Sequence, residues 1–73
     1  MAHYTVSVQW ATGEPATGQR VSLEVEGGFL DEIYTDNYGR ASFDTSCRGE
    51  ARVYVDGQDC GRMHPGNHVV TIS

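Results

Sequence analysis

Apolar and polar residues alternate along most of the chain, in short runs separated by turn residues. The first run covers residues 4–10, and the pattern returns over residues 21–26, 41–43 and 51–55. A period of two is typical of β-strands with one face on a core, and no segment has the period of an amphipathic helix. The side chains predicted to face the core are those of Tyr4, Val6, Val8, Trp10, Val21, Leu23, Val25, Ala41, Phe43, Ala51, Val53 and Val55.

Three further strands are expected from weaker patterns. Residues 29–35 predict a strand with a β-bulge, because their apolar side chains do not all fall on one face. Residues 58–63 are polar and predict a strand at a sheet edge. A turn at residues 65–67 then leads into a last strand that ends with Val69–Ile72.

Glycine, asparagine and aspartate mark the turns between these runs. Gly27-Gly28 and Asp56-Gly57 predict hairpins, and residues 35–39 predict a turn held by side chains that bond their own backbone. Turn signals recur roughly every 8–12 residues, the spacing expected of a sandwich or barrel. The prediction is therefore one all-β domain over residues 1–73, a seven-stranded antiparallel Greek-key β-sandwich.

The chain contains the motifs Gly13-x-Pro15-x-x-Gly18-x-x-Val21-x-Leu23 and Thr35-Asp36-x-x-Gly39-x-Ala41-x-Phe43. They resemble motifs of small bacterial immunoglobulin-like and carboxypeptidase-regulatory, or transthyretin-like (prealbumin-like), domains. In such domains the first motif introduces a strand that presents V-x-L to the core, and the second forms a "T-D-x-x-G" turn between strands. The resemblance implies an accessory or spacer module.

Charge and composition narrow the classes of partner. The net charge is −5, and the five basic residues, all arginine, are scattered, so nucleic acid and membrane insertion are not expected.

The absence of lysine excludes Schiff-base catalysis and the Lys–Asn isopeptide bonds of some pilus relatives. A chain of 73 residues buries only about 60% of its unfolded surface, which leaves little room for a catalytic cleft. We expect no enzyme and no cofactor. The protein is expected in the cytoplasm if Met1 is the native start, and otherwise as a part of an extracellular or periplasmic chain.

Two cysteines and two histidines are the candidate metal ligands. His64 and His68 have a spacing found in zinc sites, but Cys47 and Cys60 are thirteen residues apart and form no C-x-x-C knuckle. A Cys47–Cys60 disulfide is favoured over a metal site, and it requires the chain to fold back so that the Cα atoms lie within about 7 Å. Two free thiols remain the alternative to both.

The outer face of the strand over residues 51–55 is the candidate protein-binding surface. Arg52 and Tyr54 are two residues apart and so share that face, and both residue types are enriched at binding hot spots. Exposed strand edges offer a second route, through backbone pairing with another chain. The expected function is a non-catalytic binding or structural module. The alternative is a ligand-binding domain, for a metal through the Cys/His set or for a carbohydrate through surface tyrosines.

Overall fold

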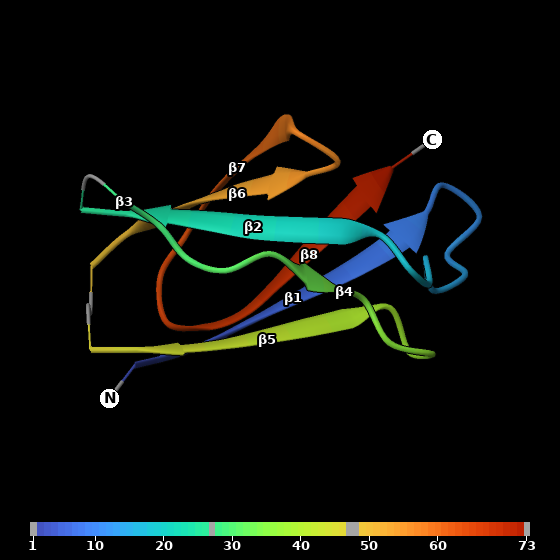
Figure 1. Cartoon of the computed structure of the whole chain (residues 1–73). Helices are drawn as coiled ribbons and strands as arrows, with labels where there is room; N and C mark the ends of the chain where they lie inside the picture. The colour runs from blue at the N-terminus through green and yellow to red at the C-terminus, as the bar shows by residue number, and fades with distance from the viewer. Residues whose placement is uncertain (1, 27, 47–48, 73) are drawn as a thin grey trace.

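The chain folds into eight β-strands without a helix in the part that the structure describes. This computed structural model describes residues 2–26, 28–46 and 49–72. The strands are β1 (Ala2–Trp10), β2 (Arg20–Val25), β3 (Gly28–Phe29), β4 (Ile33–Tyr34), β5 (Arg40–Thr45), β6 (Ala51–Val55), β7 (Gln58–Met63) and β8 (Gly66–Ile72) (Figure 1).

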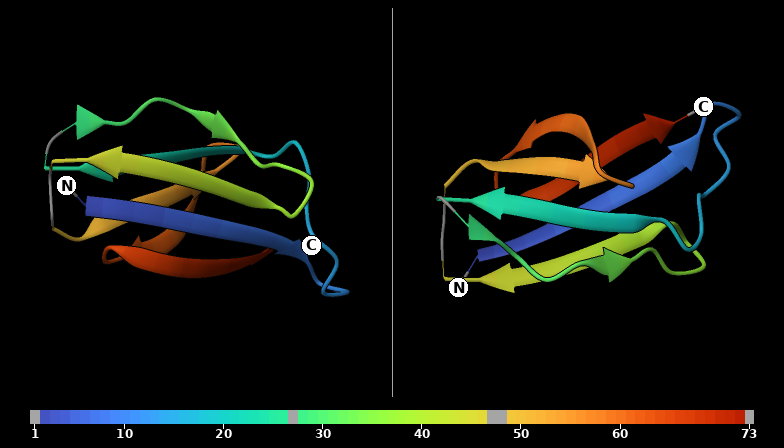
Figure 2. Two further views of the ribbon diagram at one scale, coloured as in Figure 1. Left: turned by 90° about the horizontal axis from the view of Figure 1, so that it is seen from below. Right: turned by 45° about the horizontal axis from the view of Figure 1, so that its top comes forward.

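The strands form two sheets that pack face to face, as expected of a β-sandwich. One sheet has the order β5-β1-β8; the other has the order β3-β2-β6-β7, with β4 also paired to β2 (Figure 2). The prediction of an all-β two-sheet domain is confirmed. The prediction of seven antiparallel strands is wrong, since there are eight and β1 pairs with β8 in parallel. Alternation of side chains specifies which face of a strand is buried but not the direction of its neighbour.

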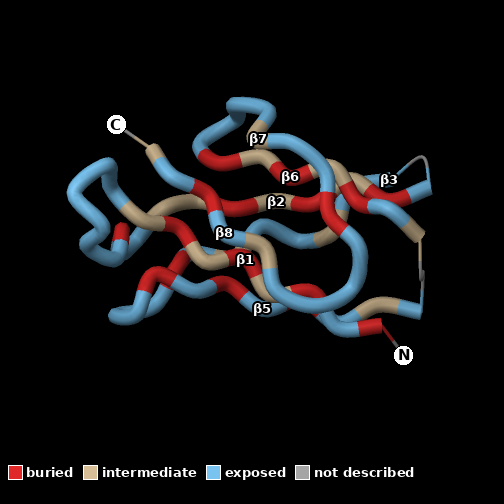
Figure 3. Tube along the Cα trace, turned by 180° about the vertical axis from the view of Figure 1, so that it is seen from behind, coloured by how far each residue is buried: buried red, intermediate tan, exposed pale blue. Residues whose placement is uncertain are grey.

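The core lies between the sheets and is apolar. Alternate residues of β1, β2, β5 and β6 are buried, as the sequence pattern predicts (Figure 3). Thr35 is the one buried polar residue among the described ones. The buried apolar residues are Ala2, Tyr4, Val6, Val8, Ala16, Val21, Leu23, Val25, Ala41, Phe43, Ala51, Val53, Val55, Met63 and Val70.

Trp10 does not belong to this core, contrary to the prediction. It is the last residue of β1 and is 38% exposed. Together with Val55 and Ile72 it lines a hollow at the rim of the sandwich. Alternation continues to the end of the strand, but the opposite sheet does not cover that end.

The single strand predicted over residues 29–35 is also wrong in detail, because the segment forms two short strands. Leu30 leaves the strand pattern, donates its N–H to the carbonyl of Leu23 at 2.8 Å, and packs against the core. Ile33 packs against the core as well, whereas Phe29 and Tyr34 are 65% and 63% exposed. The residues between β3 and β4 thus change which positions point inward.

Two of the predicted turns are confirmed. The carboxylate of Asp36 accepts hydrogen bonds from the N–H groups of Tyr38 and Arg40, at 2.8 and 3.0 Å. Residues 56 and 57 join β6 to β7 with positive φ at both positions, as a tight hairpin turn requires. Of the Gly27-Gly28 turn, only Gly28 is described, and it pairs with Val25. The last strand starts at Gly66 rather than after a turn there.

Candidate functional site

A β-bulge in β7 determines which side chains reach the outer face of the five-stranded sheet. Arg52 pairs with Arg62 and Tyr54 pairs with Asp59, so two residues of β7 stand opposite the single residue between them on β6. The carboxylate of Asp59 accepts the N–H of Gly61 at 2.9 Å and stabilises this bulge.

The bulge reverses the alternation of β7 halfway along the strand. Cys60 packs against the core on one side of the bulge, and Met63 is buried on the other. Asp59 and Arg62 are exposed and both contact outward-facing residues. Without the extra residue, Arg62 would share the inward face with Cys60.

Arg52 and Tyr54 lie on the same outer face, each in contact with neighbours from adjacent strands. Nε of Arg52 is 3.7 Å from a carboxylate oxygen of Asp59. The hydroxyl of Tyr54 donates to Glu24 on β2 at 3.3 Å, and its ring lies 5.7 Å from that of Phe29, tilted by 48°. The pKa of Arg52 is raised, first by a side-chain hydrogen bond with Tyr54 and then by the charge of Asp59.

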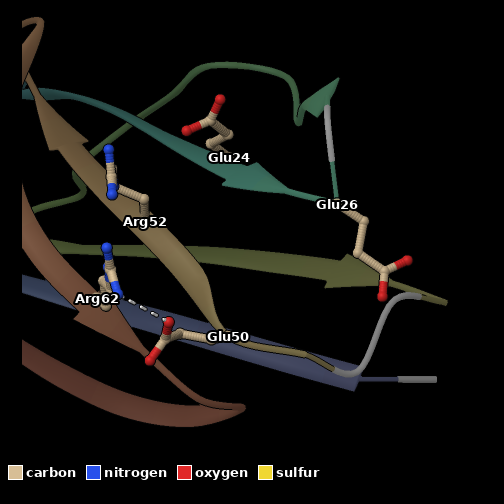
Figure 4. A pocket seen from close by; sticks show the side chains of 5 residues that line it. All are labelled: Glu24, Glu26, Glu50, Arg52 and Arg62. Carbon is tan, nitrogen blue, oxygen red and sulfur yellow. Dashed lines mark hydrogen bonds and ion pairs between the residues drawn. The ribbon is translucent and has the colours of Figure 1, made fainter.

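Arg52 also lines an open hollow of about 390 Å³ on this face, together with Glu24, Glu26, Glu50 and Arg62 (Figure 4). Guanidinium groups come from β6 and β7, and Nη1 of Arg62 is 3.5 Å from Glu50. We call the outward-facing residues of this region the charged face. It consists of Glu24, Glu26, Phe29, Glu50, Arg52, Tyr54, Asp59 and Arg62.

The ion pairs of the charged face can be replaced by charged groups of another protein. Its ion pairs join side chains that are 39–58% exposed, and solvated pairs of this kind contribute about 0–1 kcal/mol each. A partner that presents its own charged groups can therefore replace them at little cost. Two guanidinium groups stand beside four carboxylates, so the face can contact both signs of charge.

The predicted metal ligands that the structure describes come from three different parts of the chain. Cys60 is partly buried on β7, His64 is exposed in the connection between strands, and His68 is half-buried on β8. Within residues 2–26, 28–46 and 49–72, no three His, Cys, Asp or Glu side chains gather as metal ligands would. Cys47 lies outside the described residues, so the Cys47–Cys60 disulfide and the four-ligand metal site both stay predictions.

The outer face of the three-stranded sheet was not singled out from the sequence. It carries small hydroxyl and amide side chains around a hollow of about 380 Å³, lined by Thr5, Ser7, Arg40, Ser42, Asn67 and Val69. His3 and Asp44 meet at one end of it at 2.6 Å. The polar positions between Tyr4, Val6 and Val8 would have identified this face.

Asp36 is the other residue with a shifted pKa, and the shift has a structural cause. The N–H of Arg40 and then that of Tyr38 stabilise the carboxylate, so the pKa lies below its ordinary value. These are the bonds of the 35–39 turn. The shift is therefore explained by the turn and gives no sign of acid–base chemistry.

Comparison with models of known protein families and with curated protein sequences found no match. Nowhere in the described ranges does a helix occur with the length and apolarity needed to cross a bilayer.

Proposed function

We propose that this chain is a non-catalytic protein-binding module and that the charged face is its contact surface. The observation that carries the proposal is the grouping of Arg52, Tyr54 and Phe29 on one exposed sheet face, surrounded by exchangeable ion pairs. Arginine and tyrosine supply much of the binding energy at known interfaces. The finer assignment, an accessory module of the immunoglobulin-like or transthyretin-like kind, is supported by the two motifs and by the two-sheet architecture.

The partner that fits this face is a protein surface with a carboxylate and a cation in proximity. A carboxylate can form a bidentate hydrogen-bonded pair with either guanidinium group. A lysine or arginine of the partner can reach Glu24 or Glu26 at the far side of the hollow. The rings of Tyr54 and Phe29 then supply apolar area beside these polar contacts.

A binding role is favoured over a catalytic one by the character of the site. The hollow is open to solvent, and each of its two guanidinium groups already has a carboxylate partner. General acid–base catalysis relies on groups whose pKa has been moved toward neutrality by burial or by a nearby charge. The pKa of Arg52 is shifted away from neutrality instead, so its guanidinium stays charged and does not exchange a proton in this range.

The test compares two Arg–Tyr pairs at the surface of the same chain. The immobilised protein captures partners from extract of its source cells, and each captured protein is purified and titrated by calorimetry. The Arg52→Ala/Tyr54→Ala variant should weaken binding at least about 30-fold, or about 2 kcal/mol. The matched control is Arg40→Ala/Tyr38→Ala, which removes a pair with a guanidinium 5.8 Å from the ring on another part of the surface.

Each outcome either supports or contradicts the charged face as the binding surface. Loss of affinity in the first variant only, together with weaker binding at higher salt, supports the charged face as the interface. Equal affinity of wild-type protein and both variants, or a larger loss in the control, contradicts the proposal. Capture of no protein that binds after purification also contradicts it.

A further inference from the structure

The two sheets have four edges, and natural proteins protect such edges from pairing with other chains. The devices are bulges, charged side chains, proline, or very short strands. At the β7 edge, the bulge beside Gly61 and the charges of Asp59 and Arg62 serve this purpose. Arg40 and Asp44 place exposed charges on the β5 edge. β3 and β4 are two residues long each, with Asp31-Glu32 between them.

β8 is the edge strand that lacks these devices. It is seven residues long and pairs with β1 along its whole length in an unbroken register. It contains no proline and no Asp, Glu, Lys or Arg, and its last four residues, Val69–Ile72, are β-branched. Figure 2 (left) shows it as the outermost strand of the β5-β1-β8 sheet. Its free side is therefore an unprotected template for another strand.

We infer that β8 pairs antiparallel with β8 of a second copy of this chain, so that the two three-stranded sheets join into one. An interface between two identical strands forms naturally around a two-fold axis. The middle residue of Gly66–Ile72 is Val69, so the axis passes beside this residue when the strands overlap fully.

A second copy fits β8 because the strand is complementary to itself. In the centred register Val69 faces Val69 of the second copy, and its side chain, 59% exposed in the single chain, gains an apolar neighbour. Asn67 faces Thr71, an amide opposite a hydroxyl that can exchange a hydrogen bond. The net charge of −5 resides on other elements, so the pairing brings no like charges into direct opposition.

The pairing should be weak to moderate in strength. Two strands of this length exchange about six backbone hydrogen bonds, since alternate residues point their N–H and C=O outward. The area covered is at the low end of specific interfaces, so a Kd of about 10 µM to 1 mM is expected. Sedimentation equilibrium over that concentration range should show a monomer–dimer equilibrium.

Opposite charges at the axis give the sharpest test. In Val69→Lys two ammonium groups face each other, and in Val69→Glu two carboxylates do, so each variant alone should dimerise at least about tenfold more weakly. Mixing the two variants places a cation opposite an anion and should restore association. The matched control is Tyr34→Lys, at a similarly exposed residue on the other sheet and outside the charged face; this variant should dimerise like the wild type.

Each result decides the question, provided circular dichroism shows the variants folded at low concentration. Weaker association of each variant alone, with recovery in the mixture, supports the centred β8 pairing. A wild-type protein that stays monomeric at about 1 mM contradicts it, since even weak specific association has a Kd in this range. So does dimerisation that neither charge weakens, or a mixture that does not recover.

Discussion

The hydroxyl of Thr35 is a buried polar group whose removal should clearly lower stability. Thr35 is 5% exposed and follows β4, next to the loop between β1 and β2. Its Oγ1 donates to the carbonyl of Ala16 at 2.6 Å and accepts the N–H of Gln19 at 2.9 Å. Its backbone bonds the same loop, with N–H to the Gln19 carbonyl and C=O to the N–H of Gly18. One side chain thus completes the attachment of that loop.

Thr35→Val keeps the branched shape but removes both side-chain hydrogen bonds. The carbonyl of Ala16, a residue with no exposed surface, loses the partner it has in the structure. An unsatisfied buried acceptor costs about 1–3 kcal/mol, and the half-buried N–H of Gln19 adds about 1 kcal/mol. We expect the free energy of unfolding to fall by about 2–4 kcal/mol and Tm by about 10–25 °C.

The matched variant is Thr35→Ser, which keeps the hydroxyl and removes one methyl group. Burial of one methyl group contributes about 1 kcal/mol, so this variant should lose less stability than Thr35→Val. Urea unfolding followed by circular dichroism measures both values. Equal losses for the two variants, or a valine variant as stable as the wild type, would refute the assignment of the stabilisation to the hydroxyl.

Three further predictions follow from the turns and the core. In Gly39→Ala, at a φ of +76°, the new Cβ would clash with the carbonyl oxygen of Val8, so this variant should destabilise the fold by about 3 kcal/mol or more. Gly18→Ala, with a similar φ and open space around it, should cost only about 1 kcal/mol in the same thermal melts. The pKa of the folded Asp36 carboxyl lies below its ordinary 3.8, so its contribution to folding stability is present above that pH and is lost as pH falls through the folded pKa. The stability of Asp36→Asn, measured by urea unfolding, should therefore depend less on pH in the acid range than that of the wild type. Leu23→Ala, at a site without exposed surface, should cost about 2–5 kcal/mol by urea unfolding, and a loss below about 1 kcal/mol would contradict the packing described.

Much of the fold could be predicted because alternation relates sequence directly to burial. Val21, Leu23 and Val25 are buried where the pattern puts them, since neighbouring side chains of an extended strand must point to opposite faces. The direction of β8 beside β1 could not be predicted, because the same alternation suits a parallel or an antiparallel neighbour. Trp10 shows a second limit, since burial also depends on how far the opposite sheet extends.

The candidate site was predictable only in part, for a similar reason. Arg52 and Tyr54 are two residues apart, so their shared face follows from the strand alone. That Arg62 joins them depends on the β7 bulge, which a polar, unpatterned segment does not reveal. Asp59 two residues before Gly61 was the available signal, because such an aspartate can bond the backbone of a turn.

The two proposed surfaces belong to different sheets, which makes one combined consequence testable. Pairing through β8 would use the edge of the β5-β1-β8 sheet and leave the charged face on β2, β6 and β7 uncovered. The dimer would then carry two charged faces. Once one face had bound a multivalent partner, binding of the second face would become intramolecular. The apparent affinity should rise about 100-fold or more where the geometry allows both contacts. Val69→Lys should remove that gain on a surface coated densely with the partner, yet leave the affinity for free, monovalent partner unchanged. Surface plasmon resonance at high and low coating density separates the two effects, and a variant that loses affinity equally in both formats would show that the two surfaces are not independent.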